Sequence, residues 1–375
     1  MGNEDLVNFV ESLSGESHLR VQDDLGDGFV RLRAAEAQRR QAQQDIRSVE
    51  DVVLELLRNA RDAHCKSLFV ASWREGNKRH LTVIDDGDGI PETHHEQVFE
   101  PFVTSKLDSF RSDRWGVHGR GMALYSIRQN VDDVHIAKSL PGFGSSFVVC
   151  ADTEKLSEKR DQSSLPTVVK GDSGERLLRG PHNIARTVLE FAIDERENIA
   201  VYFGSPTEVA ARLYALGTAV VSRSSAVFEQ NCDSVPLVLS LAYRLDPESF
   251  SQASASLGLP MSDRSARRIM DGDIVAVDTV LSQFAAYQKS LKADKAQNPS
   301  GASGVAVDAV TAGGFAPRAP SAVAFTEDDL FEFKKSIKLA YADLAQAYYL
   351  NPEIEISIKR KNGSLYISIP LSSED

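Results

Sequence analysis

The sequence predicts an α+β fold for the N-terminal part of the chain, because a helical pattern is followed by several strand patterns. Between residues 48 and 64, apolar side chains recur at helical spacing and form one stripe of Val53, Leu56, Leu57 and Ala60. Alternating or continuous apolar segments of strand length follow over 67–73, 80–85, 134–137 and 146–150. A further helix is predicted from Met122 to about Asn130. The unit therefore ends near residue 153.

The ends of these elements carry the expected local signals. Ser48 has the side chain of a helix N-cap, and Asp51 three residues later completes a pattern like a capping box. Gly76-Asn77 predicts a hairpin turn between the first two strands. Pro141-Gly142-Phe143-Gly144 predicts the turn between the last two.

The flanking regions differ from this unit in composition. Residues 1–47 are highly charged and are expected to form a helical N-terminal arm that is solvated or docks a partner. Residues 154–176 are polar and predict a linker. Residues 177–292 show helical apolar spacing over 184–193 and 209–221, which predicts a helical domain of unknown role.

The C-terminal part begins with a segment rich in Ala, Gly, Ser and Pro. Residues 293–322 are therefore expected to be a flexible linker. In 323–375, Thr326 to Asp329 cap an amphipathic helix pattern, and two strand patterns then flank Asn362-Gly363. This order predicts a small element made of a helix and a β-hairpin.

Composition limits the class of protein. The 375 residues carry a net charge of −12, which argues against a chain that coats nucleic acid non-specifically. No apolar segment reaches the roughly 18 residues of a membrane helix, and the N-terminus lacks a signal-peptide pattern. Three widely spaced cysteines, Cys65, Cys150 and Cys232, fit neither a zinc site nor a disulfide framework. We therefore expect a cytoplasmic protein without a membrane partner.

The chemistry is concentrated on the first helix and on the turn after the second strand. Glu55, Asn59 and Asp62 lie at i, i+4 and i+7, so two carboxylates and an amide share one helix face. The segment Asp85-Asp86-Gly87-Asp88-Gly89 ends an apolar strand in a glycine turn. An acid that positions water and an amide oxygen that holds Mg²⁺ suit a nucleotide site.

Four motifs in this order resemble those of the GHKL ATPases, the family of histidine kinases, gyrase B, Hsp90 and MutL. They are Glu55-x-x-x-Asn59-x-x-Asp62-Ala63, Asp85-x-Gly87-x-Gly89, Gly116-x-x-Gly119-x-Gly121 and Gly144-Ser145-Ser146-Phe147. The segment from Val98 to Lys106 also resembles the phenylalanine box of histidine kinases, with a Thr-Ser-Lys ending like that of MutL. The resemblance implies a Bergerat-type α/β sandwich over 48–153, in which helices cover one face of a mixed, largely antiparallel sheet.

The resemblance also implies roles for single residues. Asp85 would accept a hydrogen bond from the adenine amine, and Gly87 and Gly89 would let the backbone approach the base. Asn59 would bind Mg²⁺, and Asp62 is either a ligand contact or a helix-surface residue. The amides of Gly119, Arg120 and Gly121 would hold phosphate oxygens, Lys106 or Arg120 would neutralise the γ-phosphate, and Ser146 would bond Asp85 or a water beside adenine.

Other polar residues near these motifs are interpreted as structural. Asp86 and Asp88 are expected to be turn residues. His118 is expected to be a solvated residue of the lid, and His94-His95 to be a loop. Phe99 and Phe102 are expected to pack the base of the lid.

The use of ATP remains open between three alternatives. Hydrolysis with Glu55 as general base is the first, and by resemblance it implies closure of the segment 103–121 and a nucleotide-dependent homodimer. A switch that binds ATP with little turnover is the second. Phosphoryl transfer to an unknown protein partner is the third; His18 in Glu16-Ser17-His18-Leu19-Arg20 only faintly resembles a kinase acceptor box, without the following Thr-Pro.

A DNA-binding hypothesis concerns residues 251–270. Ser251 to Pro260 and Ser262 to Met270 predict a helix, a turn and a capped helix, with Arg264, Arg267 and Arg268 on one face. An ordinary helical pair with solvated arginines is the alternative.

Overall fold

The structure is a computed structural model of the 375-residue chain. It describes residues 21–32, 45–105, 111–113, 116–118, 121–170, 175–220, 235–297, 334, 338, 341, 357–361 and 364–368. The chain forms two units, residues 1–316 and 317–375. Among the described helices, none combines the length and apolar character needed to cross a membrane.

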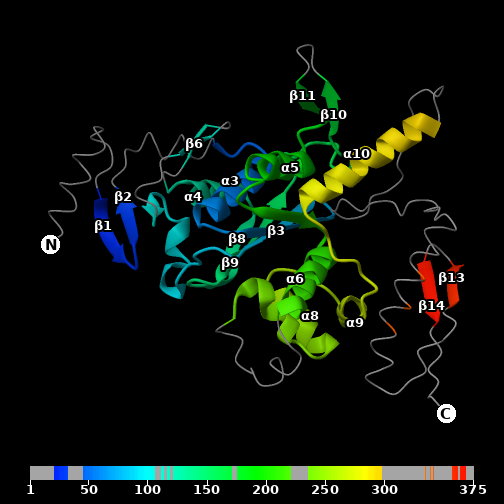
Figure 1. The fold of residues 1–375 in the computed structure, drawn as a ribbon. Helices are drawn as coiled ribbons and strands as arrows, with labels where there is room; N and C mark the ends of the chain where they lie inside the picture. The colour runs from blue at the N-terminus through cyan, green and yellow to red at the C-terminus, as the bar shows by residue number, and fades with distance from the viewer. Residues whose placement is uncertain are drawn as a thin grey trace. The chain divides into compact units, whose positions relative to one another are not determined.

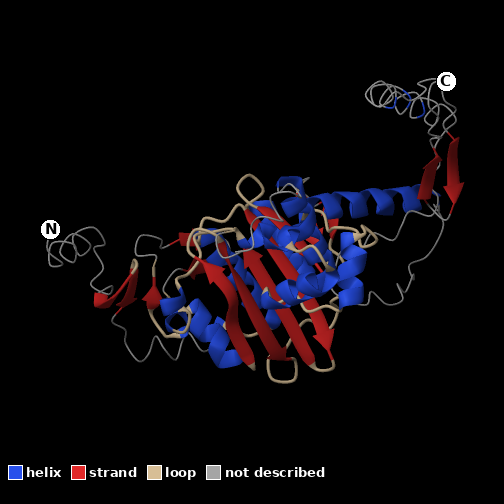
Figure 2. Ribbon diagram, turned by 90° about the horizontal axis from the view of Figure 1, so that it is seen from below, coloured by secondary structure: helices blue, strands red, loops and turns tan. Residues whose placement is uncertain are grey.

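A five-stranded mixed sheet is the centre of the first unit, in the order β12-β3-β4-β9-β8 (Figures 1 and 2). The strands are β3 (Ser67–Glu75), β4 (Lys78–Asp85), β8 (Asp133–Leu140), β9 (Gly144–Asp152) and β12 (Ala200–Gly204). All neighbouring pairs are antiparallel except β12 with β3, which is parallel. The four strands and the two turns predicted in 67–153 are confirmed.

One face of the sheet carries the predicted helices. α3 (Val49–Asp62) begins at Ser48, whose side chain accepts from the Asp51 amide in a full capping box. α3 packs against the apolar side of β4 and against α5 (Ile184–Asp194). α4 (Ala123–Asn130) and α10 (Val280–Gln297) complete this layer. The predicted stripe of Val53, Leu56, Leu57 and Ala60 is buried here.

The opposite face is covered as well, by helices from the middle of the chain. These are α6 (Pro206–Val220), the 3-10 helix η4 (Leu237–Tyr243), α8 (Pro247–Ser256) and α9 (Asp263–Met270) (Figure 1). They bury Phe69, Ala71 and Ile84, which point away from α3. Because β3 is buried on both faces, Leu68 to Ala71 form an unbroken apolar run. The helices predicted within 177–292 are confirmed, and β12 is an element that the helical pattern did not predict.

The prediction of a helical arm over 1–47 is wrong for residues 21–32. Val21–Gly26 (β1) and Phe29–Leu32 (β2) form a hairpin that pairs with β5 (Val103–Thr104). Gly26, Asp27 and Gly28 all have positive φ, which forms the tight turn and excludes a helix. Val30 and Leu32 pack with Phe102 and Met122 in a small apolar cluster. The hairpin is therefore held against the residues that flank 103–121.

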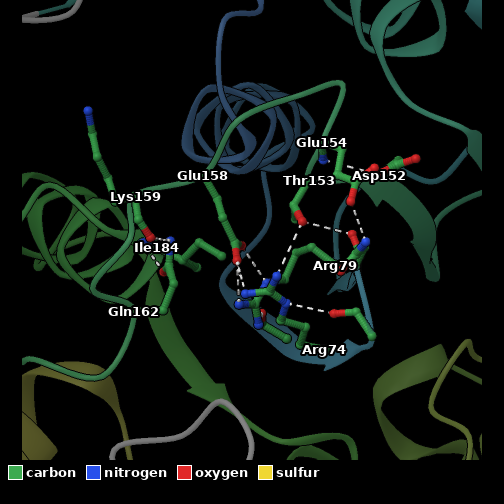
Figure 3. A network of polar contacts seen from close by, with 12 residues as sticks. Arg74, Arg79, Asp152, Thr153, Glu154, Glu158, Lys159, Gln162 and Ile184 are labelled. Carbon is green, nitrogen blue, oxygen red and sulfur yellow. Dashed lines mark hydrogen bonds and ion pairs between the residues drawn. The ribbon is translucent and has the colours of Figure 1, made fainter.

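The polar segment after β9 connects the sheet to α5 and is fixed by ionic and hydrogen bonds (Figure 3). Glu158 accepts two bonds from Arg79, at 2.8 and 3.2 Å, and one from Arg74, and the side chains of Glu158 and Arg79 are only 7% and 8% exposed. Glu50 accepts from the Lys159 amide and from Gln162, and Gln162 in turn accepts from the Ile184 amide. The expected linker is thus tied to β4, α3 and α5.

The remaining elements are short. Two further hairpins of the first unit are β6 (Arg111–Asp113) with β7 (Gly116–His118), and β10 (Thr167–Lys170) with β11 (Arg176–Arg179). Two 3-10 helices, η1 (Glu92–His94) and η2 (Gln97–Phe99), follow β4. In the second unit, β13 (Ser357–Lys361) and β14 (Ser364–Ser368) form the predicted hairpin, and Lys334, Lys338 and Tyr341 are helical as predicted. The prediction of a flexible linker over 293–322 is wrong for residues 293–297, which form the end of α10. Residues 298–322 and the rest of the predicted C-terminal helix lie outside the described residues.

Candidate nucleotide site

The face of α3 that was singled out in the sequence carries its polar residues as predicted by helical spacing. Arg58 Nη1 lies 2.5 Å from Glu55 Oε1, one turn away, and the Arg58 side chain is buried. Asn59 is on the following turn, and Asp62 is buried at the end of the helix. Arg61 Nε donates to Asp62 at 3.2 Å, and Arg61 also reaches Glu195. The helix thus holds Glu55 and Asp62 each beside an arginine.

The end of α3 lies directly against the glycine turn that follows β4. The Asp88 amide donates to the Ala63 carbonyl at 2.8 Å. A Cβ at Gly87 would lie 2.3 Å from the same carbonyl oxygen, far inside van der Waals contact. Only glycine fits at position 87, and its close approach brings α3 and the Asp85 turn together.

Asp85 ends β4 inside a buried polar cluster. Its side chain is 3% exposed, and Oδ1 accepts from the Gly87 amide at 2.8 Å. Ser145 is its register partner on β9, and the hydroxyl of Ser145 lies 3.0 Å from that of Ser139 on β8. Ser139 accepts from the Ile90 amide at 2.7 Å. A buried carboxylate with neighbouring hydroxyls can recognise a base that presents an amine.

The predicted role of Ser146 beside Asp85 is wrong. Ser146 is the register partner of Ile84, and its Oγ donates to the Leu257 carbonyl at 2.8 Å. Successive side chains of a strand point to opposite faces, so Ser145 shares the face of Asp85 and Ser146 does not. The motif placed the serine one residue too far along β9. On a strand, a shift of one residue moves the side chain to the opposite face of the sheet.

Two more glycines allow close backbone contacts around this cluster. Gly89 has φ +68°, and a Cβ there would lie 2.0 Å from the Leu140 carbonyl oxygen. Gly144 has φ +95°, and its Cβ would lie 2.0 Å from the carbonyl oxygen of Asp85. The loop after β4 and the β8–β9 turn therefore contact one another through backbone atoms, which the absence of side chains at these glycines allows.

The lid residues are described only in part. Lys106, Gly119 and Arg120 lie outside the described residues, and for Gly116 to His118 the structure gives only the backbone, as β7. Gly121 has φ +66°, and its carbonyl accepts from the Phe102 amide at 2.9 Å. A Cβ at Gly121 would lie 2.8 Å from the Val103 carbonyl oxygen. The two ends of the segment 103–121 are therefore joined directly.

The aromatic residues near the lid are buried, as expected. Phe99 packs edge-on against Phe147 with ring centroids 6.4 Å apart, and the Arg128 guanidinium lies over its other side. Phe102 belongs to the cluster under the N-terminal hairpin. These rings support the base of the lid.

The other polar residues of the turn have structural partners. Asp86 Oδ1 accepts from the amides of Lys66 and Ser67, at 2.6 and 2.8 Å, which fits its expected turn role. Asp88 pairs with His64 at the surface. His94 is a buried residue of η1 rather than an open loop; it stacks on Phe29 and lies 3.3 Å from Asp27 of the N-terminal hairpin.

Cys65 lies in the core between α3 and β3, close to the Asp85 turn. Burial, and then the charges of Asp85 and Asp86, raise the pKa of the Cys65 thiol above its ordinary value. The thiol therefore stays protonated at neutral pH, which excludes it as a nucleophile.

The donor set around α3 fits magnesium that arrives with a nucleotide. Within the described residues, no three His, Cys, Asp or Glu side chains are grouped so as to hold a metal. Mg²⁺ commonly keeps water and binds substrate phosphates with one or two protein oxygens, which the amide of Asn59 can supply. Among the described residues, the side chains alone therefore offer too few ligands for a metal that is held without a nucleotide.

Three polar residues of the candidate site, Arg58, Ser145 and Ser139, were not predicted from the sequence. Arg58 could have been found from its i+3 spacing to Glu55. Ser145 could have been found by counting the β9 register from the closing glycine turn. Ser139 carried no signal, because its contact depends on how β8 pairs with β9.

Comparison with known proteins agrees with this geometry. Residues 44–155 match the family model described as histidine kinase-, DNA gyrase B- and HSP90-like ATPase. The DNA mismatch repair protein MutL of Thermus thermophilus is 45% identical over 82 residues, which are 22% of this chain and 15% of MutL. The sensor protein RstB of Escherichia coli is 41% identical over 81 residues, 21% of this chain and 18% of RstB.

A longer match is to the circadian input-output histidine kinase CikA of Synechococcus elongatus, which is 26% identical over 221 residues. These residues are 55% of this chain and 29% of CikA. The chain thus matches well under a third of the length of each of these relatives. Residues 44–155 contain the α3 face, the Asp85 turn and the closing strand β9, and they form a domain of the GHKL ATPase family.

Proposed function

We propose that residues 44–155 bind Mg²⁺-ATP and hydrolyse it. The observation that carries this proposal is the buried Asp85 carboxylate, surrounded by Ser145, Ser139 and the close-packed glycines 87, 89 and 144, beside the end of α3. A buried carboxylate of this kind can bind the adenine amine and leave the phosphates to the helix face. The family membership of this domain supports the binding of ATP.

In the proposed reaction, Glu55 is the general base. A water molecule gives a proton to the Glu55 carboxylate while its oxygen attacks the γ-phosphorus. The bond from the γ-phosphorus to the bridging oxygen breaks, which leaves ADP and phosphate. Arg58, 2.5 Å from Glu55, is a positioning residue that orients the carboxylate.

The other predicted residues keep their proposed roles. Asn59 holds Mg²⁺ against the phosphates, and the amides of Gly119 to Gly121, with Lys106 or Arg120, bind the phosphate oxygens. Asp62 is a proposed contact through water. Nucleotide binding closes the segment 103–121, and closure favours a homodimer in the cytoplasm.

The proposal is tested by steady-state turnover of Mg²⁺-ATP in the wild type and in Glu55→Gln, with ATP affinity measured separately by titration calorimetry. Glu55→Gln keeps the side-chain volume, so affinity should stay within a few-fold while turnover falls by about 10² or more. Asp85→Asn is the matched control, because it should abolish affinity for ATP and leave Glu55 intact. Normal turnover in Glu55→Gln would exclude Glu55 as the base.

A second candidate is phosphoryl transfer to a partner protein, favoured by the 221-residue match to CikA, which is a histidine kinase. It predicts ATP binding without turnover, and labelled phosphate from the γ-position of ATP on a second protein. His18, the weaker acceptor within the chain, lies outside the described residues. ATP binding with neither turnover nor transfer would favour the switch.

A further inference from the structure

The helix, turn and second helix predicted over 251–270 are present in the structure, on the sheet face opposite α3. α8 begins at Asp246, which accepts from the Ser249 amide, and α9 begins at Ser262, which accepts from the Ser265 amide. α9 packs against both α8 and α6. Each helix therefore starts at a defined residue, and the pair forms one packed unit.

The turn between the helices is fixed on both sides. Ser254 Oγ donates to the Leu259 carbonyl at 2.8 Å, and the Leu259 amide donates to the Ser254 carbonyl at 2.9 Å. Gly258 has φ +75°, and Leu257 and Leu259 on either side of it are buried. The angle between the two helices is thus set by bonds and burial.

The turn is also anchored to the ATPase sheet. Thr82 Oγ1 donates to the Gly258 carbonyl, and Ser146 Oγ donates to the Leu257 carbonyl. Thr82 and Ser146 lie on the face of β4 and β9 opposite α3. In the chain, Ser146 follows Ser145 of the Asp85 cluster and precedes Phe147. The outer side of the helix pair remains free of the sheet.

That outer side is basic. Arg264, Arg267 and Arg268 lie at i, i+3 and i+4, so they share one face of α9, while Ala266 and Ile269 are buried on the other. All three arginines are exposed. Across the described parts of the chain, none of the three forms an ion pair, whereas many other arginines do, including Arg58, Arg79 and Arg212.

The charge of this face differs from that of the whole chain, whose net charge is −12. The acidic neighbours stand at the ends of α9: Asp263 is held by the Ser251 hydroxyl, and Asp271 and Asp273 follow the last turn. Within the described residues, the three guanidinium groups between them have no carboxylate partner and form a compact anion-binding stripe. Guanidinium groups form bidentate bonds with phosphates and with guanine edges.

We propose that α8 and α9 form a helix-turn-helix unit that binds duplex DNA, with the arginine face of α9 in the major groove. A second helix held by a first across a short fixed turn is the arrangement that places side chains in a major groove. A convex helix face with three long cationic side chains fits a groove lined by phosphates, whereas an acidic peptide needs a cleft. The binding requires no nucleotide, so it is independent of the proposed hydrolysis.

The test is fluorescence anisotropy with the full chain, without nucleotide, and a labelled mixed-sequence duplex of about 25 base pairs, titrated from about 25 to about 200 mM NaCl. We expect binding at low salt that weakens steeply with added salt. Arg267→Glu/Arg268→Glu should lower the affinity by about tenfold or more per arginine and reduce the salt slope by about 1 for each phosphate that is no longer neutralised. Arg264→Ala, which adds no negative charge, should weaken binding in the same direction.

The matched control is Arg160→Glu/Arg196→Glu, which makes the same charge change at exposed arginines outside the α8–α9 unit. It should bind DNA as the wild type does. Circular dichroism and the thermal midpoint should show that each variant is folded. Absence of binding at low salt, equal losses in the control, or full binding by the Arg267/Arg268 variant would overturn the proposal. Equal competition by a polyglutamate peptide of the same charge would overturn it too, in favour of an acidic protein partner.

Discussion

At the scale of single residues, the candidate site depends on atoms that lie too close for any side chain to be added. Gly87, Gly89 and Gly144 each meet a backbone carbonyl oxygen within 2.3 Å of an added Cβ. Backbone atoms cannot move aside as the end of a flexible side chain can. The surroundings of Asp85 are therefore determined by the absence of side chains at these glycines as much as by the polar side chains.

Gly89→Ala should destabilise the protein and weaken ATP binding far more than Gly142→Ala. Both residues have positive φ, +68° and +77°, which costs alanine about 1 kcal/mol. Only Gly89 adds a clash, since nothing lies within 4 Å of a Cβ at Gly142. Urea unfolding and ATP titration of the two variants check this, and equal losses would show that the clash relaxes at little cost.

Because the thiol of Cys65 is buried, we expect the free energy of unfolding to fall at alkaline pH. Its pKa is raised in the folded state, so above the ordinary value of 9.0 the unfolded chain releases a proton that the folded protein keeps. The free energy of unfolding should then fall with rising pH by up to about 1.4 kcal/mol per unit. Below pH 9 this contribution is fully present.

Urea unfolding between about pH 8 and about pH 10.5 measures the effect. In Cys65→Ala the slope above pH 9 should be shallower than in the wild type, whatever the overall loss of stability. Identical slopes would mean that the thiol does not keep its proton. Cys150→Ala serves as the comparison variant. The pKa of the Cys150 thiol is also raised by burial, but this cysteine is less buried than Cys65.

At the scale of elements, the polar segment after β9 is bound to the sheet and to two helices through Glu158 and Gln162. The ion pair of Arg79 with Glu158 joins it to β4, and Glu50 with Gln162 joins it to α3 and α5 (Figure 3). The sequence shows only that this segment is polar. Polar composition predicts a linker, but it does not show whether the charged side chains are solvated or form ion pairs within the protein.

Glu158→Gln should lower the free energy of unfolding by about 3–5 kcal/mol, because it leaves Arg79 buried without its counter-charge. The double variant Arg79→Met/Glu158→Met should be much closer to the wild type, since it removes both buried charges. Denaturant unfolding of the single and double variants gives the coupling energy. A double variant as unstable as the sum of the single ones would contradict a direct interaction.

At the scale of the whole first unit, the ATPase sheet is buried on both faces. Phe69, stacked on Tyr202 at 4.8 Å, and Ile84 pack into the cluster formed with the middle helices, and β12 pairs with the edge of β3. Full burial of each such side chain contributes about 1.5–3 kcal/mol. Residues of β12, α6, η4, α8 and α9 are thus part of the core that supports the nucleotide domain.

A fragment of residues 44–155 should therefore fail to fold cooperatively, although it contains the whole matched domain. It would expose Phe69, Ala71 and Ile84, bind a hydrophobic dye and unfold over a broad denaturant range. The fragment 44–297, which keeps both helical layers, is the control and should unfold in one sharp transition. A sharp transition of the shorter fragment would show that the second layer is dispensable.

The sequence by itself determined most of the local elements and the family to which the domain of residues 44–155 belongs. Ser48 and Asp51 specify the start of α3, and glycines favour the turns that need a positive φ, because caps and backbone preferences are properties of single residues and their neighbours. Only the tertiary structure decided that Ser145 rather than Ser146 faces Asp85, that residues 21–32 form a hairpin paired with β5, and that β12, α6, η4, α8 and α9 close the sheet. These depend on strand register and on contacts between residues far apart in the chain, which a local pattern does not contain.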